Sequence, residues 1–356
     1  MIFDEKKTEA LISIFSKDYD FHFCSIPEIE DVVNFIDQYW KKNHILVLSR
    51  ELLDWQYLEK KYNRYNFVIA RERSSGEIHG LLGFIQNSHF DDAITCDFRA
   101  GAIWKVRNDI DASGLGIVLD FYTNKALKVN YSYGIGLSSD AIKNWKVTTV
   151  MEHYFLKNPN LINFKIAKNI ENCIVPHFGL CDGWQLKELN LADYLSLNED
   201  LELFKSIHNF KSKKFYINRY YKHPVYKYLF LAIQNRDEVK AIFILRECYA
   251  NDAKCIRIID YIGKFNFLKN ISENLLNFLT INHYEYMDIL AANIDFGAFQ
   301  EAGFINRRND EHIVIPNYFE PFLRENVAIS YTSSIPWNLP FFKGDADQDR
   351  PNVPWW

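Results

Sequence analysis

In the first half of the chain, segments whose apolar residues have the spacing of a strand are followed by segments with the spacing of a helix. Apolar, β-rich runs predict strands at 21–25, 66–73, 79–86, 101–106 and 131–137. Apolar residues three and four positions apart predict helices at 27–40, from Ser49 onward, at 117–129 and at 138–143. Residues 146–156 again have the composition of strands. The order is strand, two helices, three strands, helix and strand, which predicts an α/β (α+β) fold.

The same order returns in the second half. Strands are predicted at 226–234, 238–247, 254–262 and 286–292, and helices at 270–280 and 296–304. Between the halves, residues 157–205 are irregular, and we expect the chain to cross between domains there. A chain of 356 residues exceeds what one hydrophobic core usually supports. We therefore predict two domains, 1–165 and 166–329, followed by an extended tail, 330–356.

Composition favours a folded protein over a disordered or nucleic-acid-binding one. Apolar residues make up 48% of the chain and aromatic residues 16%, which is ample for packed cores. The net charge is −5, and Lys and Arg are scattered rather than clustered, so no electrostatic argument for nucleic acid exists.

The six cysteines form no C-x-x-C pair, and Cys173, His177 and Cys181 match no common zinc-site spacing. We therefore expect no metal. The N-terminal sequence lacks an apolar leader, and no window approaches the length of about 18 apolar residues that a membrane span needs. These features predict a reduced, cytoplasmic protein without membrane contact, and they leave its oligomeric state open.

A turn of small residues joins the predicted strand at 101–106 to the helix at 117–129. Its sequence is Asp111-Ala112-Ser113-Gly114-Leu115-Gly116. Such a turn leaves backbone N–H groups uncovered at the start of a helix, where the helix dipole favours an anion. We therefore interpret this turn as a pyrophosphate cradle.

The strand order and this turn resemble the GCN5-related N-acetyltransferase fold, whose turn has the pattern Q/R-x-x-G-x-G/A. Both glycines match at Gly114 and Gly116, whereas Asp111 stands where the family has Gln or Arg. The resemblance implies two tandem domains of this type, each a mixed, mostly antiparallel sheet flanked by helices. It also implies acetyl-CoA, or another acyl-CoA, as cofactor. The cofactor-binding residues that it implies are Ile103, Trp104, Lys105, Val106, Asp111, Ser113, Gly114, Leu115 and Gly116, and the strand N–H groups among them would polarise the thioester carbonyl.

The second half and the tail extend the resemblance. The counterpart of the cradle in the second half, 263–267, has one glycine instead of two, so we expect a single cofactor site in the first half. The tail sequence Phe342-Lys343-Gly344-Asp345-Ala346-Asp347-Gln348-Asp349-Arg350-Pro351 resembles the end of two-domain acetyltransferase-like proteins that belong to bacterial surface-polysaccharide gene clusters.

Acyl transfer to an amine needs a base for the incoming ammonium and an acid for the departing thiolate. The candidates are Asp97 and His153 as bases and Tyr133 as the acid. The alternatives are a same-face ion pair between Asp97 and Arg99 and a structural role for His153 at an interface.

Substrate-binding candidates have aromatic rings, hydrogen-bond donors or charges suited to a sugar or a phosphate. They are Arg99, Arg219, Tyr220, His223, Asp347, Asp349 and Arg350. The alternative for the cluster at 219–224 is an interdomain contact, and the alternatives for the tail are a solvated acidic segment or a metal site.

Together these features predict an acyl-CoA-dependent N-acyltransferase acting on an amino sugar or a sugar nucleotide for surface glycans. One alternative is a non-catalytic protein of the same fold that binds a glycan or a partner protein. A second is a Fem-like ligase that transfers amino acids from charged tRNA, although the acidic net charge and the missing helical arm disfavour it.

Overall fold

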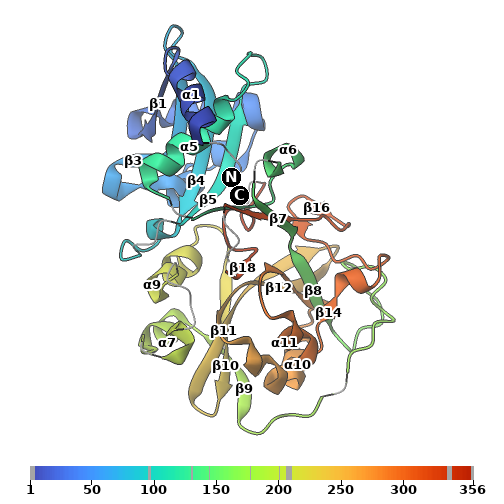
Figure 1. Cartoon of the computed structure of the whole chain (residues 1–356). Helices are drawn as coiled ribbons and strands as arrows, with labels where there is room; N and C mark the ends of the chain where they lie inside the picture. Colours follow the sequence, from blue (N-terminus) through green and yellow to red (C-terminus); the bar gives the residue numbers. More distant parts are fainter. Residues whose placement is uncertain are drawn as a thin grey trace.

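The computed structural model describes residues 5–94, 98–129, 131–143, 145–176, 178–199, 201–205, 211–334 and 339–353. The described chain forms two lobes, each built on a sheet of eight strands (Figure 1). Nearly all neighbouring strands are antiparallel, and one pair in each sheet is parallel. The predicted class, a tandem pair of mixed sheets flanked by helices, is therefore confirmed.

The first sheet has the strand order β1-β3-β4-β5-β6-β17-β7, with β2 paired to β3. Its strands are β1 (Tyr19–Ser25), β2 (Leu58–Glu59), β3 (Arg64–Glu72), β4 (Ile78–Gln86), β5 (Phe98–Val106), β6 (Tyr131–Ile135), β7 (Val147–Val150) and β17 (Ser330–Ser333). The helices of this lobe are α1 (Glu5–Phe15), α2 (Ile29–Phe35), α3 (Ile45–Leu48), α4 (Arg50–Tyr57), α5 (Leu115–Leu127) and α6 (Ser139–Ile142).

The second sheet has the strand order β14-β8-β13-β12-β11-β10-β9, with β18 paired to β13. Its strands are β8 (Glu152–Lys157), β9 (Trp184–Leu189), β10 (Tyr228–Asn235), β11 (Glu238–Ala250), β12 (Ala253–Gly263), β13 (Tyr286–Ala292), β14 (Ile305–Asn306) and β18 (Phe341–Phe342). A separate hairpin joins β15 (Tyr318–Phe319) to β16 (Phe322–Leu323). The helices are α7 (Leu191–Ser196), α8 (Glu202–Lys205), α9 (Lys213–Tyr216), α10 (Ser272–Ile281) and α11 (Phe296–Glu301).

Helices cover both faces of the first sheet. On one face, Leu115 and Leu119 of α5 pack against Val68 and Leu82. On the other face, α2 and α4 pack against the sheet, and this apolar core continues without interruption into the second lobe, where it includes Phe230 and Ile259. The two lobes therefore share one core.

Local sequence signals account for several element boundaries. Ser49 caps α4, since its side chain accepts a hydrogen bond from the Leu52 amide at 3.2 Å. The helix expected at 27–40 is α2 followed by one π-helical turn at Ile36–Trp40. Residues 157–205 differ from the expectation of an irregular crossing, because β9 lies within them and pairs with β10.

The chain changes sheets at Met151, between β7 in the first sheet and β8 in the second (Figure 1). Near its end it returns to the first sheet as β17, which lies between β6 and β7. The sheets thus exchange segments, and the domain limits drawn from the sequence at 165 and 329 remain proposals.

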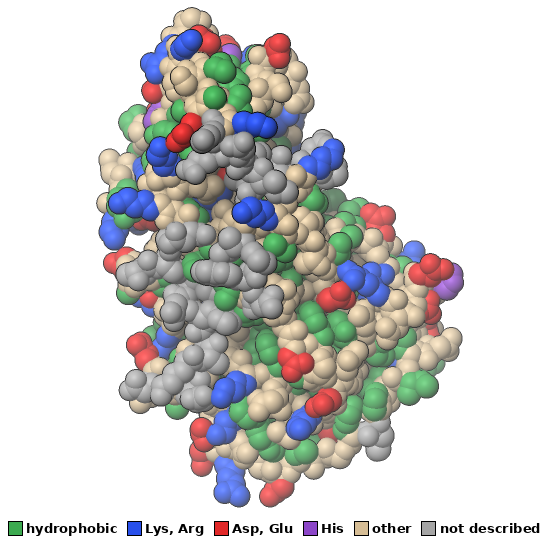
Figure 2. All heavy atoms as spheres, viewed as in Figure 1, with side chains coloured by type: hydrophobic (Ala, Val, Ile, Leu, Met, Phe, Trp, Pro, Cys, Tyr) green, Lys and Arg blue, Asp and Glu red, His purple; other side chains and the backbone are tan. Residues whose placement is uncertain are grey.

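Lysine and arginine side chains are interspersed with aspartate and glutamate over the face of the molecule that Figure 2 shows. None of the helices in the described residues is long and apolar enough to cross a membrane. Within the same residues, no three His, Cys, Asp or Glu side chains gather as a metal site would require.

Candidate functional site

The turn before α5 has the conformation expected of an anion cradle. Gly114 occupies the N-cap position with φ of +97°, a left-handed conformation that favours glycine. The Leu115 amide donates to the Ala112 carbonyl at 3.1 Å, and no side chain caps this 13-residue helix. The amides that follow Leu115 in the first turn therefore keep their hydrogen-bonding capacity for another acceptor. Gly116 lies one residue into the helix, and its carbonyl accepts a hydrogen bond from the Trp104 indole at 3.0 Å.

β5 precedes this turn and β6 follows its helix, and these two strands pair over only part of their length. β5 and β6 pair in parallel from Phe98↔Tyr131 to Gly101↔Gly134, and beyond Gly101 the only strand paired with β5 in the described chain is β4. The outer edge of Ile103–Val106 therefore presents backbone groups that no strand uses. The structure thus places the predicted cofactor residues of strand and turn next to one another.

Side chains around the cradle differ in exposure. Asp111 and Ser113 are exposed, whereas Leu115 is fully buried against the sheet. Leu11 and Phe15 of α1 approach Gly114, where an added Cβ would lie 3.6 Å and 3.7 Å from them. Helix α1 therefore borders the cradle.

The corresponding gap in the second lobe is filled by the chain itself. β12 and β13 pair in parallel only from Ile256 to Ile258, and β18 then pairs with β13. The next residues continue across the gap: the Lys343 amide donates to the Leu290 carbonyl at 3.1 Å, and the Gly344 amide donates to the Ile259 carbonyl at 3.0 Å. The start of the tail segment 341–349 thus lies in the second lobe beside β12, at the place that corresponds to the edge of β5 with which no strand pairs in the first lobe.

Buried ion pairs hold this tail segment in place. Lys211 lies 2.9 Å from Asp345 and 2.8 Å from Asp260, and Arg246 lies 2.7 Å from Asp349. The exposed fractions of Asp345, Asp347 and Asp349 are 3%, 7% and 3%. The alternative of a solvated acidic tail is therefore wrong, because these carboxylates are buried.

The structure gathers most of the predicted substrate-binding residues around the same segment. Arg219 donates to the carbonyl groups of Gly344 and Ala346 at 3.2 Å and 2.6 Å, and Tyr220 donates to Asp260 at 2.7 Å. Arg350 contacts Asp347 at 3.3 Å. These contacts are internal to the chain.

Two further candidates are buried and already partnered. His223 accepts hydrogen bonds at Nδ1 from the Val225 and Tyr226 amides, and burial lowers its pKa to about 3. Arg99 is fully buried, and its carboxylate partner is Asp120 of α5 at 2.6 Å.

The candidate catalytic residues do not form one cluster in the described chain. Asp97 lies outside the described residues. Tyr133 is buried in the first sheet with its ring 4.5 Å from that of Phe341, and burial raises its pKa well above the ordinary value. His153 belongs to the second sheet, where its Nε2 lies 2.8 Å from Asp288 and burial lowers its pKa despite that carboxylate.

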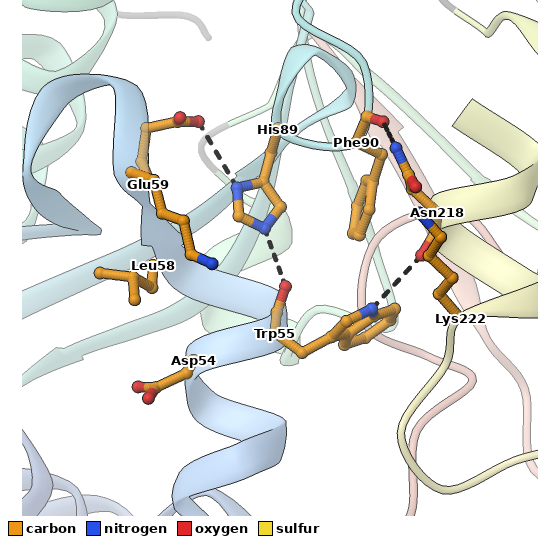
Figure 3. A pocket seen from close by; sticks show the side chains of 9 residues that line it. Asp54, Trp55, Leu58, Glu59, His89, Phe90, Asn218 and Lys222 are labelled. Atoms are coloured by element: carbon orange, nitrogen blue, oxygen red, sulfur yellow. Dashed lines mark hydrogen bonds and ion pairs between the residues drawn. The ribbon is translucent and has the colours of Figure 1, made fainter. Parts of the chain in front are cut away.

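A hollow of about 420 Å³, which no sequence pattern had indicated, lies at the junction of the lobes (Figure 3). Its walls come from segments far apart in the chain, namely Asp54, Trp55, Leu58, Glu59, Lys60, His89, Phe90, Asn218 and Lys222. Within it, the His89 ring lies between Glu59, 3.4 Å from Nδ1, and the Trp55 carbonyl, 2.8 Å from Nε2. Only the folded arrangement brings these residues together.

Comparison with solved structures identifies the fold. A GCN5-related N-acetyltransferase from Anabaena variabilis matches with a TM-score of 0.53 and 11% identity, over 88% of this chain and 72% of that one. Saccharomyces cerevisiae N-myristoyltransferase matches with a TM-score of 0.49 and 9% identity, over 89% of this chain and 80% of that one. A probable N-acyltransferase from Enterococcus faecalis matches with a TM-score of 0.48 and 9% identity, over 88% and 72%.

The sequence matches no protein-family model and no curated protein. The first of the structural likenesses shows that the chain has the fold of the GCN5-related N-acetyltransferases. Together with the two parallel strand pairs, it confirms the resemblance drawn from strand order and from Gly114 and Gly116.

Proposed function

We propose that this protein is an acyl-CoA-dependent N-acyltransferase with one cofactor site, in the first lobe. One observation carries the proposal: the edge of β5 with which no strand pairs beyond Gly101 lies beside the start of a helix without a side-chain cap, whereas residues 341–344 bind the equivalent edge in the second lobe. The neighbouring folds in the comparison, an N-acetyltransferase and an N-myristoyltransferase with bound myristoyl-CoA, agree with this class of reaction.

The residues present fit such a cofactor. The amides that follow Leu115 in the first turn of α5 would bind a pyrophosphate, and the unpaired edge of Ile103–Val106 would orient a carbonyl group. When bound, acyl-CoA supplies the acyl group as an activated thioester. The chain would then contribute mainly orientation of the two reactants, which by itself accounts for a large part of catalysis in reactions between bound partners.

We propose acetyl as the acyl group and an amino sugar or a sugar nucleotide, made for surface glycans, as the acceptor. The similarity of the tail sequence to tandem proteins of polysaccharide gene clusters supports this acceptor. Asp97 remains the candidate base, and a reaction that draws on acyl-CoA favours the cytoplasm as its location.

Calorimetric titration of the full chain with acetyl-CoA tests the proposal. We expect saturable binding that Gly114→Asp or Gly116→Asp abolishes, since a carboxylate there repels phosphate. Gly76→Asp is the matched control: Gly76 also has positive φ, +73°, and an added Cβ there meets nothing within 4 Å. Absence of heat with acetyl-CoA and with longer acyl-CoA esters would refute the proposal.

One observation favours a second function. The exposed Asp111 carboxylate stands where the family has Gln or Arg, and it would repel phosphate at the cradle. A non-catalytic glycan-binding or partner-binding protein would follow if Asp111→Gln, like the unsubstituted chain, bound no acyl-CoA. Binding that appears only in Asp111→Gln would show that this carboxylate has closed the site.

A further inference from the structure

β5 and β6 diverge beyond Gly101 and Gly134, and the space that opens between them, here called the fork, has one side on each strand. On β6, the Gly134 carbonyl accepts a hydrogen bond from β17 at 3.3 Å, and the Gly136 amide donates one to β17 at 2.7 Å. Because backbone groups of successive residues in a strand point to opposite edges, the Ile135 carbonyl points into the fork. Among the described strands, none pairs with this edge of β6 beyond Gly134.

A side chain from the tail binds this carbonyl instead. Gln348 donates from Nε2 to the Ile135 carbonyl at 3.1 Å, and its Oε1 accepts from the Tyr318 hydroxyl at 3.4 Å. Since a carbonyl can only accept, the first contact fixes which end of the amide is the nitrogen. The amide lies against Gly136, where an added Cβ would overlap Nε2. The tail thus places a primary amide on the β6 side of the first-lobe fork.

This amide has a donor to spare. A glutamine amide carries two N–H groups. Within the described chain, the partner of Nε2 is the Ile135 carbonyl, which uses one of them. The Gln348 side chain is half-buried rather than enclosed. Its second N–H is therefore available to a ligand in the fork, on a side chain that Tyr318 and Ile135 hold in place.

β5 is irregular at the same level of the sheet. Its pairing with β4 shifts between Gly101 and Trp104, where β5 has one residue more than β4. Such a bulge bends a strand and is common next to active sites. Because Gly101 is the last residue of β5 that pairs with β6, the bulge lies level with Ile135. The bulge and Gln348 therefore lie on the two sides of the fork, at its closed end.

We propose that Gln348 binds the cofactor of the first lobe and that its second N–H donates to the carbonyl of the acyl thioester. The cradle lies at the other end of the free β5 edge, since an added Cβ at Gly116 would be 3.6 Å from Val106. The acyl end of a cofactor held at the cradle and extended along β5 would therefore lie toward Gln348. Side-chain amides polarise carbonyl groups in this way in oxyanion holes. This inference rests on the proposed N-acyltransferase function.

Calorimetric titration of the full chain with three ligands tests the inference. The ligands are acetyl-CoA, CoA, and S-ethyl-CoA, which has the size of acetyl-CoA without its carbonyl. Gln348→Leu keeps most of the side-chain volume and removes both N–H groups. We expect this variant to bind acetyl-CoA about five- to tenfold more weakly than the parent, the usual effect of one hydrogen bond, and to bind the other two ligands within about twofold.

Tyr318→Phe is the second variant, because it retains Gln348 and removes the hydrogen bond that orients its amide. It should weaken acetyl-CoA binding about two- to threefold and leave S-ethyl-CoA binding unchanged. It decides the question if thermal unfolding shows that Gln348→Leu is not folded. Gln185→Leu is the matched control: its amide binds the Gln234 side chain at 3.2 Å on the edge strand β9, so all three affinities should stay the same.

Infrared difference spectra of bound acetyl-CoA, isotopically labelled at the carbonyl carbon, give a second readout. A hydrogen bond lowers the stretching frequency of a carbonyl, so the band in the parent should lie below that in Gln348→Leu. The inference is overturned if the band does not move, if the variant binds acetyl-CoA as well as the parent, or if it binds all three ligands equally more weakly. These results leave the proposed function intact, whereas a parent that binds none of the ligands refutes both.

Discussion

Lys343 lies in the interior with 2% of its surface exposed, and its ammonium group has no hydrogen-bond partner in the described chain. Burial, together with the charge of Arg257, lowers its pKa to about 7, although Asp349 acts in the opposite direction. A lysine in this setting opposes folding at neutral pH, because the unfolded chain binds a proton more tightly than the folded one.

Replacing this lysine gives the first stability prediction. Between pH 7 and the ordinary lysine value of 10.5, the unfolded chain holds the proton and the folded chain does not, so stability through Lys343 rises with pH. Lys343→Met should therefore have a higher free energy of unfolding than the parent at pH 7. The gain should be about 1.4 kcal/mol for each unit by which the pKa of Lys343 differs between the folded and the unfolded chain. The gain should shrink toward pH 10.

Urea unfolding of both proteins at pH 7, 8.5 and 10 measures this effect. Taking the difference between variant and parent cancels the titration of other groups. A difference that stays constant over this range would show that Lys343 keeps its ordinary pKa in the folded protein.

Single residues could be assigned from the sequence where their partners are close in the chain. Ser49 as a helix cap and Gly114 as the turn residue both follow from neighbours a few positions away. His153 and Asp349 differ, because their partners Asp288 and Arg246 lie more than a hundred positions away. No local sequence pattern reveals such pairs. The sequence therefore suggested His153 and Asp349 as site residues without showing that both are buried and paired within the chain.

At the scale of elements, the tail segment 341–349 depends on a close approach at Gly344. An added Cβ there would lie 2.6 Å from the Ile259 side chain and 2.8 Å from its carbonyl oxygen. The segment can therefore cross between β12 and β13 only with glycine at this position.

Gly344→Val should lower the free energy of unfolding by about 1–3 kcal/mol, the usual effect of overpacking, while acetyl-CoA binding in the first lobe persists. Gly179→Val is the control, since an added Cβ there meets nothing within 4 Å. Denaturant unfolding and calorimetry measure the two effects. Equal stability of the two variants would contradict the packing seen at Gly344.

Helices and strands were predicted correctly where the spacing of apolar residues and the residue types of the adjoining turns indicate the same element. The strands β3 and β4 and the helix α5 lie within a few residues of their predicted positions. β9 and β17 were missed, because both are short and their apolar and polar residues alternate only weakly. β9 is stabilised by pairing with β10, and β17 is stabilised by pairing with β6 and β7.

At the scale of the whole molecule, the two lobes share one apolar core. Phe341 is fully buried, and its ring lies 4.5 Å from that of Tyr133 and 5.0 Å from that of Tyr331, both in the first sheet. The same residue belongs to β18 of the second sheet. Its side chain therefore links the lobes.

We expect a single calorimetric unfolding transition. Phe341→Ala should destabilise the whole molecule by about 3–5 kcal/mol without dividing that transition. Ile174→Ala, at a position 85% exposed, should change stability by no more than about 0.5 kcal/mol. Two separate transitions in the parent protein would show that the lobes unfold independently.

The repeated order of elements made the tandem fold predictable from sequence, since each half carries its own local signals. The exchange of segments between the sheets was not predictable, because distant partners decide which sheet β8 and β17 join. The lobe-junction hollow was hidden for the same reason: its two sides, at Glu59 and Lys222, meet only when the lobes assemble.

The position of β17 also constrains how the protein can be made. Residues 330–333 fill the space between β6 and β7 in the first sheet, yet they are synthesised after strands β8–β16. While the ribosome is still elongating the second lobe, β6 and β7 have no strand to join them. The first lobe therefore cannot complete its sheet until β8–β16 have been synthesised.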